Sequence, residues 1–556
     1  MFRQVLRQRV KPLSFSALKW SPQITRSFTK SIRVNKPIIE SSIFPRSRIL
    51  KSLTIVIGVG GSVYIIDKYA YSSLITRSVR ALYVLLWIAY EYGLNTASYS
   101  NINDLHEKCA ESLLDLLMKN KGLYIKLGQA IANQGSIFPL AYQIRFEKMY
   151  DDAPIESWSK IDNVLKQNLG ANYESEIFES IDHDPVASAS IAQVHKAVLK
   201  GSGEKVAVKI QHSYIGNQIV IDLFIYRFMA KIYEKVFELP MSMFTSYVSK
   251  QMQLEVNFIN ELGNAEKLRE LLDNDPTLSN INVYIPKNYR DVSTEQILVS
   301  EWIEGISLVE KQKLLDLGYN VSLMMKQYLT IFGRQIFKYG FVHSDPHPGD
   351  LLARFDKNGK QQLVVLDHGL YISLPDKFRV EYCNLWRYLF SYNKEGIEDI
   401  GRNWGIQAIE LFSTLVQLRP PVLDQTKIDN DKRNVNSLFQ DFIGDESRFP
   451  LELLFLARTM RMIQTLNQGF GSPVNRINLL TKASVDALAT EKSLKFNEYF
   501  DVILIRLNIF FSGLIFFLIR LRQVLLGDRY GGKGKGFEDY IEVYLQNTAK
   551  SLGIDM

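Results

Sequence analysis

The chain has 556 residues, of which 46% are hydrophobic and 22% charged, so its composition is that of a folded protein too long for one ordinary core. The net charge of +7 arises in residues 1–39, which hold nine Lys and Arg and no acidic residue; the rest carries 57 basic and 59 acidic side chains. This nearly neutral body argues against nucleic-acid binding. Two cysteines without CxxC spacing argue against a disulfide framework and a cysteine-based zinc site.

The N-terminal segment is rich in arginine and serine and lacks an unbroken apolar core. That pattern is typical of a mitochondrial transit peptide and not of a secretory signal. We expect residues 1–28 to be the transit peptide, with cleavage after Phe28. A disordered basic tail is the alternative.

Residues 29–100 form a linker that contains an uncharged apolar run at 53–66, preceded by Arg46, Arg48 and Lys51. The run is shorter than the about 20 residues that cross a bilayer, but Ile49 and Leu50 extend it if Lys51 reaches back to the interface. We expect a single transmembrane segment here, with a buried core helix as the alternative. Basic residues on its N-terminal side predict that the body after it faces the intermembrane space.

Hydrophobic periodicity divides the remaining chain into three parts. Residues 101–180 have leucines at three- and four-residue intervals, which predicts a helical extension. Residues 181–305 combine strand patterns, EKVAVKIQH and QILVSEWIEG, with helical patterns at 214–236 and 241–275. Residues 306–556 are mainly helical, interrupted by HSDPHPGDLLARF and the short strand QQLVVLDHG. The sequence therefore predicts an α+β protein with a small strand-containing lobe before a larger helical lobe.

The C-terminal part contains a second strongly apolar stretch, at 502–521. Arg506 and Arg520 interrupt it and leave 13 residues between them, which is short for a membrane span. A buried core helix and a membrane-surface helix, with its arginines at the water interface, are the two main interpretations.

Four charged residues occur in an order and at spacings that indicate a functional site. Lys209 lies in the strand motif VAVK, Asp345 and Asp350 lie five apart in HSDPHPGD, and Asp367 follows a strand in LVVLDHG. Protein-kinase-like phosphotransferases use a strand lysine to grip nucleotide phosphates, a loop aspartate to meet the acceptor hydroxyl, and two further residues to hold Mg²⁺. Each motif alone is weak evidence, but together, in this order and spacing, they predict a nucleotide site with Mg²⁺.

Two histidines flank Asp345 and could be mistaken for metal ligands. His343 and His347 have no third His or Cys nearby in the sequence. We expect His343 to orient the loop and His347 to pack against it or hydrogen-bond with it.

With these motifs in place, the chain resembles the UbiB family of atypical kinase-like proteins. The resemblance covers residues 105–400. The motifs that carry it are KxGQ as Lys126-Leu127-Gly128-Gln129, DDAP at 151–154, an alanine-rich loop as ASASIAQVHKA at 187–197, an ExD-type helix with Glu255, Asn257 and Glu261, and HSDPHPGD for HxDPHPGN. The N-terminal features add a similarity to fungal mitochondrial inner-membrane members that are linked to coenzyme Q distribution and phospholipid homeostasis.

The resemblance implies a two-lobed protein-kinase-like fold with an N-terminal KxGQ extension that binds ATP or ADP with Mg²⁺. It implies that Glu255 pairs with Lys209 and that Glu261 holds Lys126 near the nucleotide. The implied catalytic residues are Asp345, Lys209 and Glu255, the implied metal ligands are Asp350 and Asp367, and the implied nucleotide-binding residues are Ala187, Ser188, Ala189, Ser190, Lys209, Lys126, Gln129 and Glu261.

The resemblance also bears on the substrate. Because the KxGQ helices of the family lie where a peptide would dock, it implies ATP hydrolysis or phosphotransfer to a lipid or quinone-like small molecule at the inner membrane. Two departures from the family pattern, Asn257 in place of Asp and Asp350 in place of the metal-binding Asn, favour an alternative. In that alternative the protein is a catalytically silent, nucleotide-gated scaffold or a lipid-handling protein.

Overall fold

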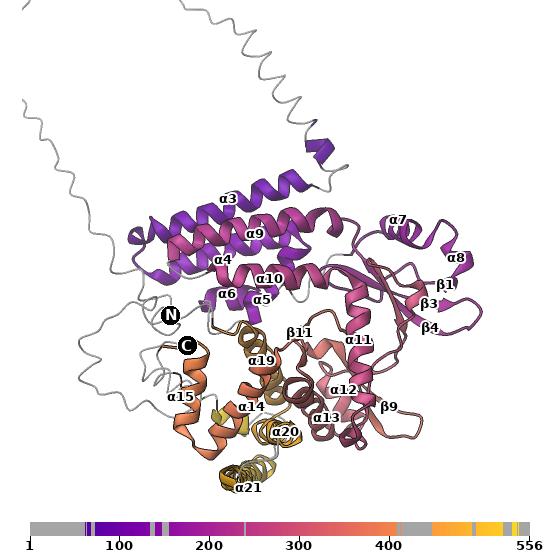
Figure 1. Cartoon of the computed structure of the whole chain (residues 1–556). Helices are drawn as coiled ribbons and strands as arrows, with labels where there is room; N and C mark the ends of the chain where they lie inside the picture. Colours follow the sequence, from indigo (N-terminus) through magenta and orange to yellow (C-terminus); the bar gives the residue numbers. More distant parts are fainter. Residues whose placement is uncertain are drawn as a thin grey trace, which may run out of the picture.

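The computed structural model describes residues 62, 64–67, 73–133, 139–146, 149, 155–237, 241–407, 412, 448–491, 496–525, 536–541 and 543. The expected transit peptide, most of the apolar run at 53–66 and the DDAP motif at 151–154 therefore lie outside the described residues. The predicted α+β architecture is confirmed: a layer of helices lies above a strand-containing lobe and a larger, mainly helical lobe (Figure 1).

The helical layer combines the predicted extension with helices from the first lobe. Its members are α3 (Leu74–Gly93), α4 (Ile102–Asn120), α5 (Leu123–Asn133), α6 (Leu140–Phe146), α9 (Ile215–Phe237) and α10 (Met241–Glu255). Leucines of α4 spaced as predicted, such as Leu105 and Leu117, are buried in its core. The buried ion pair between Arg77 of α3 and Asp222 of α9, 2.5 Å apart, joins two helices within this layer.

An antiparallel sheet forms the first lobe. Its strands run in the order β1 (Phe178–Ile181), β3 (Ala192–Leu199), β4 (Lys205–Gln211) and β6 (Ile297–Glu301), and β2 (Ala187–Ser188) pairs with β3. The alternation predicted for β4 is confirmed, because Val206, Val208 and Ile210 are fully buried on one face. Helices α7 (Trp158–Leu169) and α8 (Tyr173–Glu176) pack at the same end of the molecule (Figure 1).

The loop formed by the alanine-rich motif is shorter than expected. Residues 192–197 belong to β3, so the turn between β2 and β3 consists only of residues 189–191, closed by a 2.8 Å hydrogen bond from Ala189 N to Ala192 O. Alternating burial along β3 explains why this half of the motif extends as a strand.

The helical pattern at 241–275 is broken into two helices, α10 and α11 (Phe258–Asp273). Asn257 makes the break: its side-chain oxygen accepts a 3.0 Å hydrogen bond from Ile259 N and caps the start of α11. Glu255 thus ends one helix and Glu261 lies in the first turn of the next. This separation decides which lysine each glutamate meets.

The larger lobe is built around α13 (Val321–Gly333), η5 (Arg334–Tyr339), α14 (Asp376–Ser391) and α20 (Arg476–Glu491), whose apolar side chains form the largest core cluster. Two small sheets position the motif residues. In one sheet, β8 (Phe341–His343) pairs with β11 (Tyr371–Ser373). In the other, β9 (Leu351–Phe355) lies between β10 (Gln361–Val365) and β7 (Ile306–Ser307). Strand β10 also pairs with β5 (Val283–Tyr284). The remaining helices are α12 (Lys311–Asp316), α15 (Lys394–Asn403), α19 (Glu452–Gly469) and α21 (Phe496–Leu525).

The apolar stretch at 502–521 lies in α21, at the edge of the larger lobe (Figure 1). Its interpretation as a core helix is wrong, because almost none of the stretch Val502–Leu525 is buried. By length and composition this helix could cross a membrane, and it is the one such helix among the described residues.

Candidate functional site

The HSDPHPGD loop, residues 343–350, begins at the last residue of β8 and ends with the short helix η6 (Pro348–Asp350). Backbone N–H groups fix its shape by donating to its two histidines: Asp345 N to His343 Nδ1 at 3.2 Å and Gly349 N to His347 Nδ1 at 3.1 Å. These bonds confirm the predictions that His343 orients the loop and that His347 hydrogen-bonds with it. Within the described part of the chain, no group of three or more His, Cys, Asp and Glu has the geometry of a metal site.

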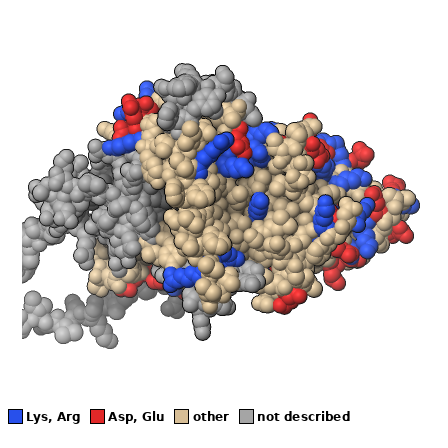
Figure 2. Space-filling view, turned by 90° about the horizontal axis from the view of Figure 1, so that it is seen from below, with Lys and Arg blue, Asp and Glu red and all other residues tan. Residues whose placement is uncertain are grey.

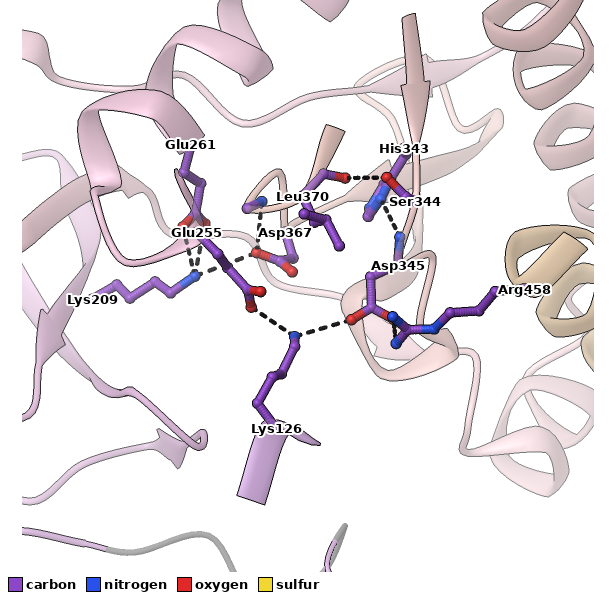
Figure 3. A network of polar contacts seen from close by, with 11 residues as sticks. Lys126, Lys209, Glu255, Glu261, His343, Ser344, Asp345, Asp367, Leu370 and Arg458 are labelled. Carbon is purple, nitrogen blue, oxygen red and sulfur yellow. Dashed lines mark hydrogen bonds and ion pairs between the residues drawn. The ribbon is translucent and has the colours of Figure 1, made fainter. Parts of the chain in front are cut away.

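Lys209 projects from β4 toward two carboxylates of other elements (Figure 3). Its Nζ lies 2.8 Å from both carboxylate oxygens of Glu261 and 3.3 Å from Oδ1 of Asp367. Burial alone would lower the pKa of Lys209, but Glu261 and Asp367 outweigh it and raise that pKa above its ordinary value. Lys209 is therefore a fixed cation at the junction of the two lobes.

Lys126 of α5 points between the two lobes from the helical layer (Figure 3). Its Nζ lies 2.7 Å from Glu255 and 3.0 Å from Asp345. The expected pairing of Glu255 with Lys209 and of Glu261 with Lys126 is therefore wrong, and the partners are exchanged. The cause is the helix break at Asn257, which leaves Glu255 at the end of α10 and turns Glu261 toward β4.

Asp345 is held by a second cation that the sequence motifs do not contain. Arg458 of α19 donates from Nη2 to Asp345 Oδ1 at 2.8 Å, while Lys126 bonds to Oδ2 (Figure 3). Burial acts to raise the pKa of Asp345, but Lys126 and Arg458 lower it to about 2. Asp345 is thus an ionised group and a weak base in this arrangement.

Arg458 lies 113 residues after Asp345, in an amphipathic helix with no recognised motif. Its side chain is only 9% exposed. An arginine on the buried side of a helix indicates a buried anion, because a charged group is rarely buried unpaired. That signal is present in the sequence, but it does not identify the partner.

Asp350 and Asp367 form an acidic pair with too little positive charge for both carboxyl groups. Burial first, and the nearby Asp367 second, raise the pKa of Asp350 to about 8. Burial also acts to raise the pKa of Asp367, but Lys209 outweighs it, and the pKa of Asp367 lies below its ordinary value. Such a pair of oxygen donors fits a hard divalent cation, which would supply the missing charge.

The remaining predicted nucleotide residues lie in α5 and at the turn between β2 and β3. Gln129 donates from Nε2 to the Met149 carbonyl at 3.3 Å, which holds α5 against the segment after α6. Ala187 and Ser188 form β2, Ala189 begins the turn, and the buried Ser190 lies within it. The turn is braced by a 3.2 Å hydrogen bond between His212 Nε2 and the Ala189 carbonyl.

The glycine of the KxGQ motif lets α5 pack closely on its neighbours. A Cβ added at Gly128 would lie 2.9 Å from Leu117 Cδ1 and closer still to the buried Met149 side chain. We therefore expect Gly128→Ala to lower the free energy of unfolding by about 1–3 kcal/mol through overpacking. Chemical denaturation measures the change. Gly263→Ala is the matched control, since nothing lies within 4 Å of the added Cβ; equal destabilisation in both variants would contradict the packing argument.

The sequence of this chain is similar to those of several known proteins. Residues 148–400 match a protein family that is described as "ABC1 atypical kinase-like domain". An ABC1 family protein of Schizosaccharomyces pombe is 36% identical over 485 residues, covering 84% of this chain and 90% of that protein. The ABC1 family protein lscO of Purpureocillium lilacinum is 31% identical over 528 residues, covering 86% and 87%. AarF domain-containing protein kinase 1 of Xenopus laevis is 29% identical over 429 residues, covering 74% and 81%.

Proposed function

The chain belongs to the ABC1 family of atypical kinase-like proteins, the UbiB or AarF family, and we propose that it binds ATP with Mg²⁺ where Lys209, Asp350 and Asp367 converge. The observation that carries the proposal is the position of Lys209, whose ammonium is fixed between Glu261 and Asp367. Nucleotide phosphates need a fixed cation, and a strand lysine held by a helix glutamate supplies it in kinase-like enzymes.

Asp350 and Asp367 would hold the metal. When bound, Mg²⁺ neutralises phosphate charge and positions the terminal phosphoryl group. The contribution of the chain is the pair of buried carboxyl groups, and burial together with the neighbouring Asp367 raises the pKa of one of them, Asp350, to about 8. ADP would use the same lysine and the same pair.

We propose ATP hydrolysis or phosphotransfer to a lipid or quinone-like small molecule as the activity. Asp345 would orient water or the acceptor hydroxyl; its low pKa makes it a weak base, so positioning is its main role. Because Lys126 of the helical layer bonds to Asp345, α5 stands at the place where a peptide hydroxyl would have to approach. A protein substrate is therefore disfavoured.

The proposed setting is the mitochondrial inner membrane, in coenzyme Q distribution and membrane lipid homeostasis. The acid-free, arginine-rich N-terminus and the apolar run at 53–66 support this location. The body after the run would face the intermembrane space, since the basic residues precede it.

One observation favours a second function, a nucleotide-gated scaffold without turnover. Both oxygens of Asp345 are engaged, one by Lys126 and one by Arg458. If these bonds persist when nucleotide binds, ATP would shift conformational populations without being consumed.

Nucleotide binding is tested by removing the charges that would grip it. We expect Lys209→Ala and Asp367→Ala to abolish the thermal stabilisation by MgATP, which amounts to about 2.7 kcal/mol at a ligand concentration of 100 Kd. The measurement is a thermal-shift titration that compares each variant with and without MgATP. Lys205→Ala is the matched control, because Lys205 lies on the same strand but is exposed, and its one ion pair with a described residue is with Glu304, 3.8 Å away. Undiminished stabilisation in the first two variants would reject the site.

A further inference from the structure

Helix α21 has the reverse of the usual amphipathic arrangement. In a soluble protein the apolar side of a surface helix faces the core and the polar side faces water. Here Asn508, Ser512, Arg520 and Gln523 contact the lobe, whereas most apolar side chains of the helix are exposed and only Ile505 among those described is fully buried. This arrangement is typical of helices whose outer side is surrounded by lipid.

The inward side is bound by hydrogen bonds. Asn508 donates to the Phe390 carbonyl at 2.5 Å, and Ser512 accepts from Asn475 at 3.1 Å. Arg520 and Gln523 both donate to the Gly471 carbonyl, at 3.1 and 3.2 Å. These bonds along the helix fix its rotation, so its apolar side cannot turn inward without breaking them.

The outward side is a continuous apolar strip. Its spacing of three and four residues keeps the side chains on one face, over a length of about 33 Å at 1.5 Å per residue. The strip consists of side chains that are 42–77% exposed: Ile503, Leu504, Leu507, Phe510, Phe511, Leu514, Ile515, Phe517, Leu518, Leu521, Val524 and Leu525. An apolar surface of this extent marks an interaction site.

Charge identifies the chemistry of the occupant. Between residues 502 and 525 the helix has Arg506, Arg520 and Arg522 and no acidic residue. Figure 2, which views the side of the molecule where α21 lies, shows a broad central area without Asp or Glu. An anionic lipid surface matches both features, since it offers hydrocarbon for the strip and phosphates for the exposed Arg506 and Arg522. A second copy of the same face would offer only like charges.

We propose that the outward side of α21 inserts into the interface of an anionic lipid bilayer, with the helix axis in the membrane plane. A membrane span is disfavoured because Asn508, Ser512, Arg520 and Gln523 bond to the lobe. The contact is separate from the apolar run at 53–66, since α3, which follows that run, lies at the opposite end of the molecule from α21 (Figure 1). It is also independent of the nucleotide site.

The test places an environment-sensitive fluorophore on the full-length chain. Both native cysteines are buried, so Leu514→Cys provides a selective labelling site on the strip. Val220→Cys is the matched control: Val220 is apolar and 64% exposed, but it lies on α9. With vesicles of phosphatidylcholine and phosphatidylglycerol, we expect a blue shift and quenching by lipid-attached quenchers for the probe at 514 and not for the probe at 220.

Charge is tested separately. Arg506→Gln should weaken binding of the strip to these vesicles about fivefold, the equivalent of about 1 kcal/mol for one arginine near an anionic surface. Lys357→Gln, which removes a charge from an exposed turn elsewhere, should not. The proposal is overturned by equal shifts at 514 and 220, by no shift at 514, or by a shift that needs no vesicles and grows with protein concentration, which would indicate association between copies.

Discussion

Asp345→Asn is expected to lower nucleotide turnover by about 10²–10⁴-fold while MgATP binding survives. The carboxylate is the one group of the loop whose two oxygens lie between cations, and an amide keeps its size but not its charge. Without that charge, an attacking water or hydroxyl loses the acceptor that orients it. Phosphate release by the purified protein, with and without lipid vesicles and quinone-like phenols, measures the effect.

Arg458→Ala provides the control for this interpretation. Removing one of the two cations raises the pKa of Asp345 from about 2 toward its ordinary value, because Lys126 alone then opposes the effect of burial less fully. Activity that requires ionised Asp345 should therefore be lost at a higher pH on the acid side of the rate profile. A parent protein that binds MgATP but shows no turnover under any of these conditions, or an Asp345→Asn variant that turns over normally, would favour the scaffold function.

The sequence was enough to predict most of the residues that form the site, but not which lysine pairs with which glutamate. Lys209 lies within a strand, and Asp345, Asp350 and Asp367 lie in short segments after strands. These local patterns are visible in the sequence, so the order of the residues was informative. The exchange of partners between the two lysines depends on one capping side chain, Asn257, which divides an apparently continuous helical pattern.

Two other features required tertiary contacts. Arg458 meets Asp345 only because α19 packs beside the HSDPHPGD loop, and no spacing rule connects residues so far apart. The apolar stretch of α21 had the composition of a core helix. Its orientation follows from hydrogen bonds that Asn508 and Arg520 make to backbone carbonyls of the lobe, and these were invisible in the sequence.

Asp350 is one of the two positions, with Asn257, where the chain departs from the motif pattern that it otherwise resembles, and the structure changes the expected effect of this departure. A second charged carboxylate beside Asp367 would repel nucleotide phosphates, by roughly 4 kcal/mol for each like-charge pair at about 4 Å and an effective dielectric near 20. Burial and Asp367 raise the pKa of Asp350 to about 8, so without metal it holds a proton at neutral pH. The proton, and not only the metal, relieves the repulsion.

The resulting prediction concerns the pH dependence of metal-assisted binding. In the parent protein the metal must displace the proton of Asp350, so affinity for MgATP should rise up to about tenfold per pH unit between pH 7 and 8 and level off above. Asp350→Asn keeps an oxygen ligand and has no proton to lose, so its affinity should be nearly independent of pH in this range. Asp350→Ala should lose the tightening by Mg²⁺ altogether.

Calorimetric titrations with Mg²⁺ and with chelator, in buffers of different ionisation enthalpy, count the protons released on binding. The stability of the metal-free protein gives an independent check that the pKa of Asp350 is raised by folding. The folded state then binds the proton more tightly than the unfolded chain does. The free energy of unfolding of the parent relative to Asp350→Asn should therefore fall as pH rises from about 4 to about 8. Above pH 8 the ionised Asp350 repels phosphates, so metal-free ATP should bind more weakly to the parent than to Asp350→Asn. The same pH slope and metal dependence in all three proteins would show that Asp350 neither carries this proton nor binds the metal.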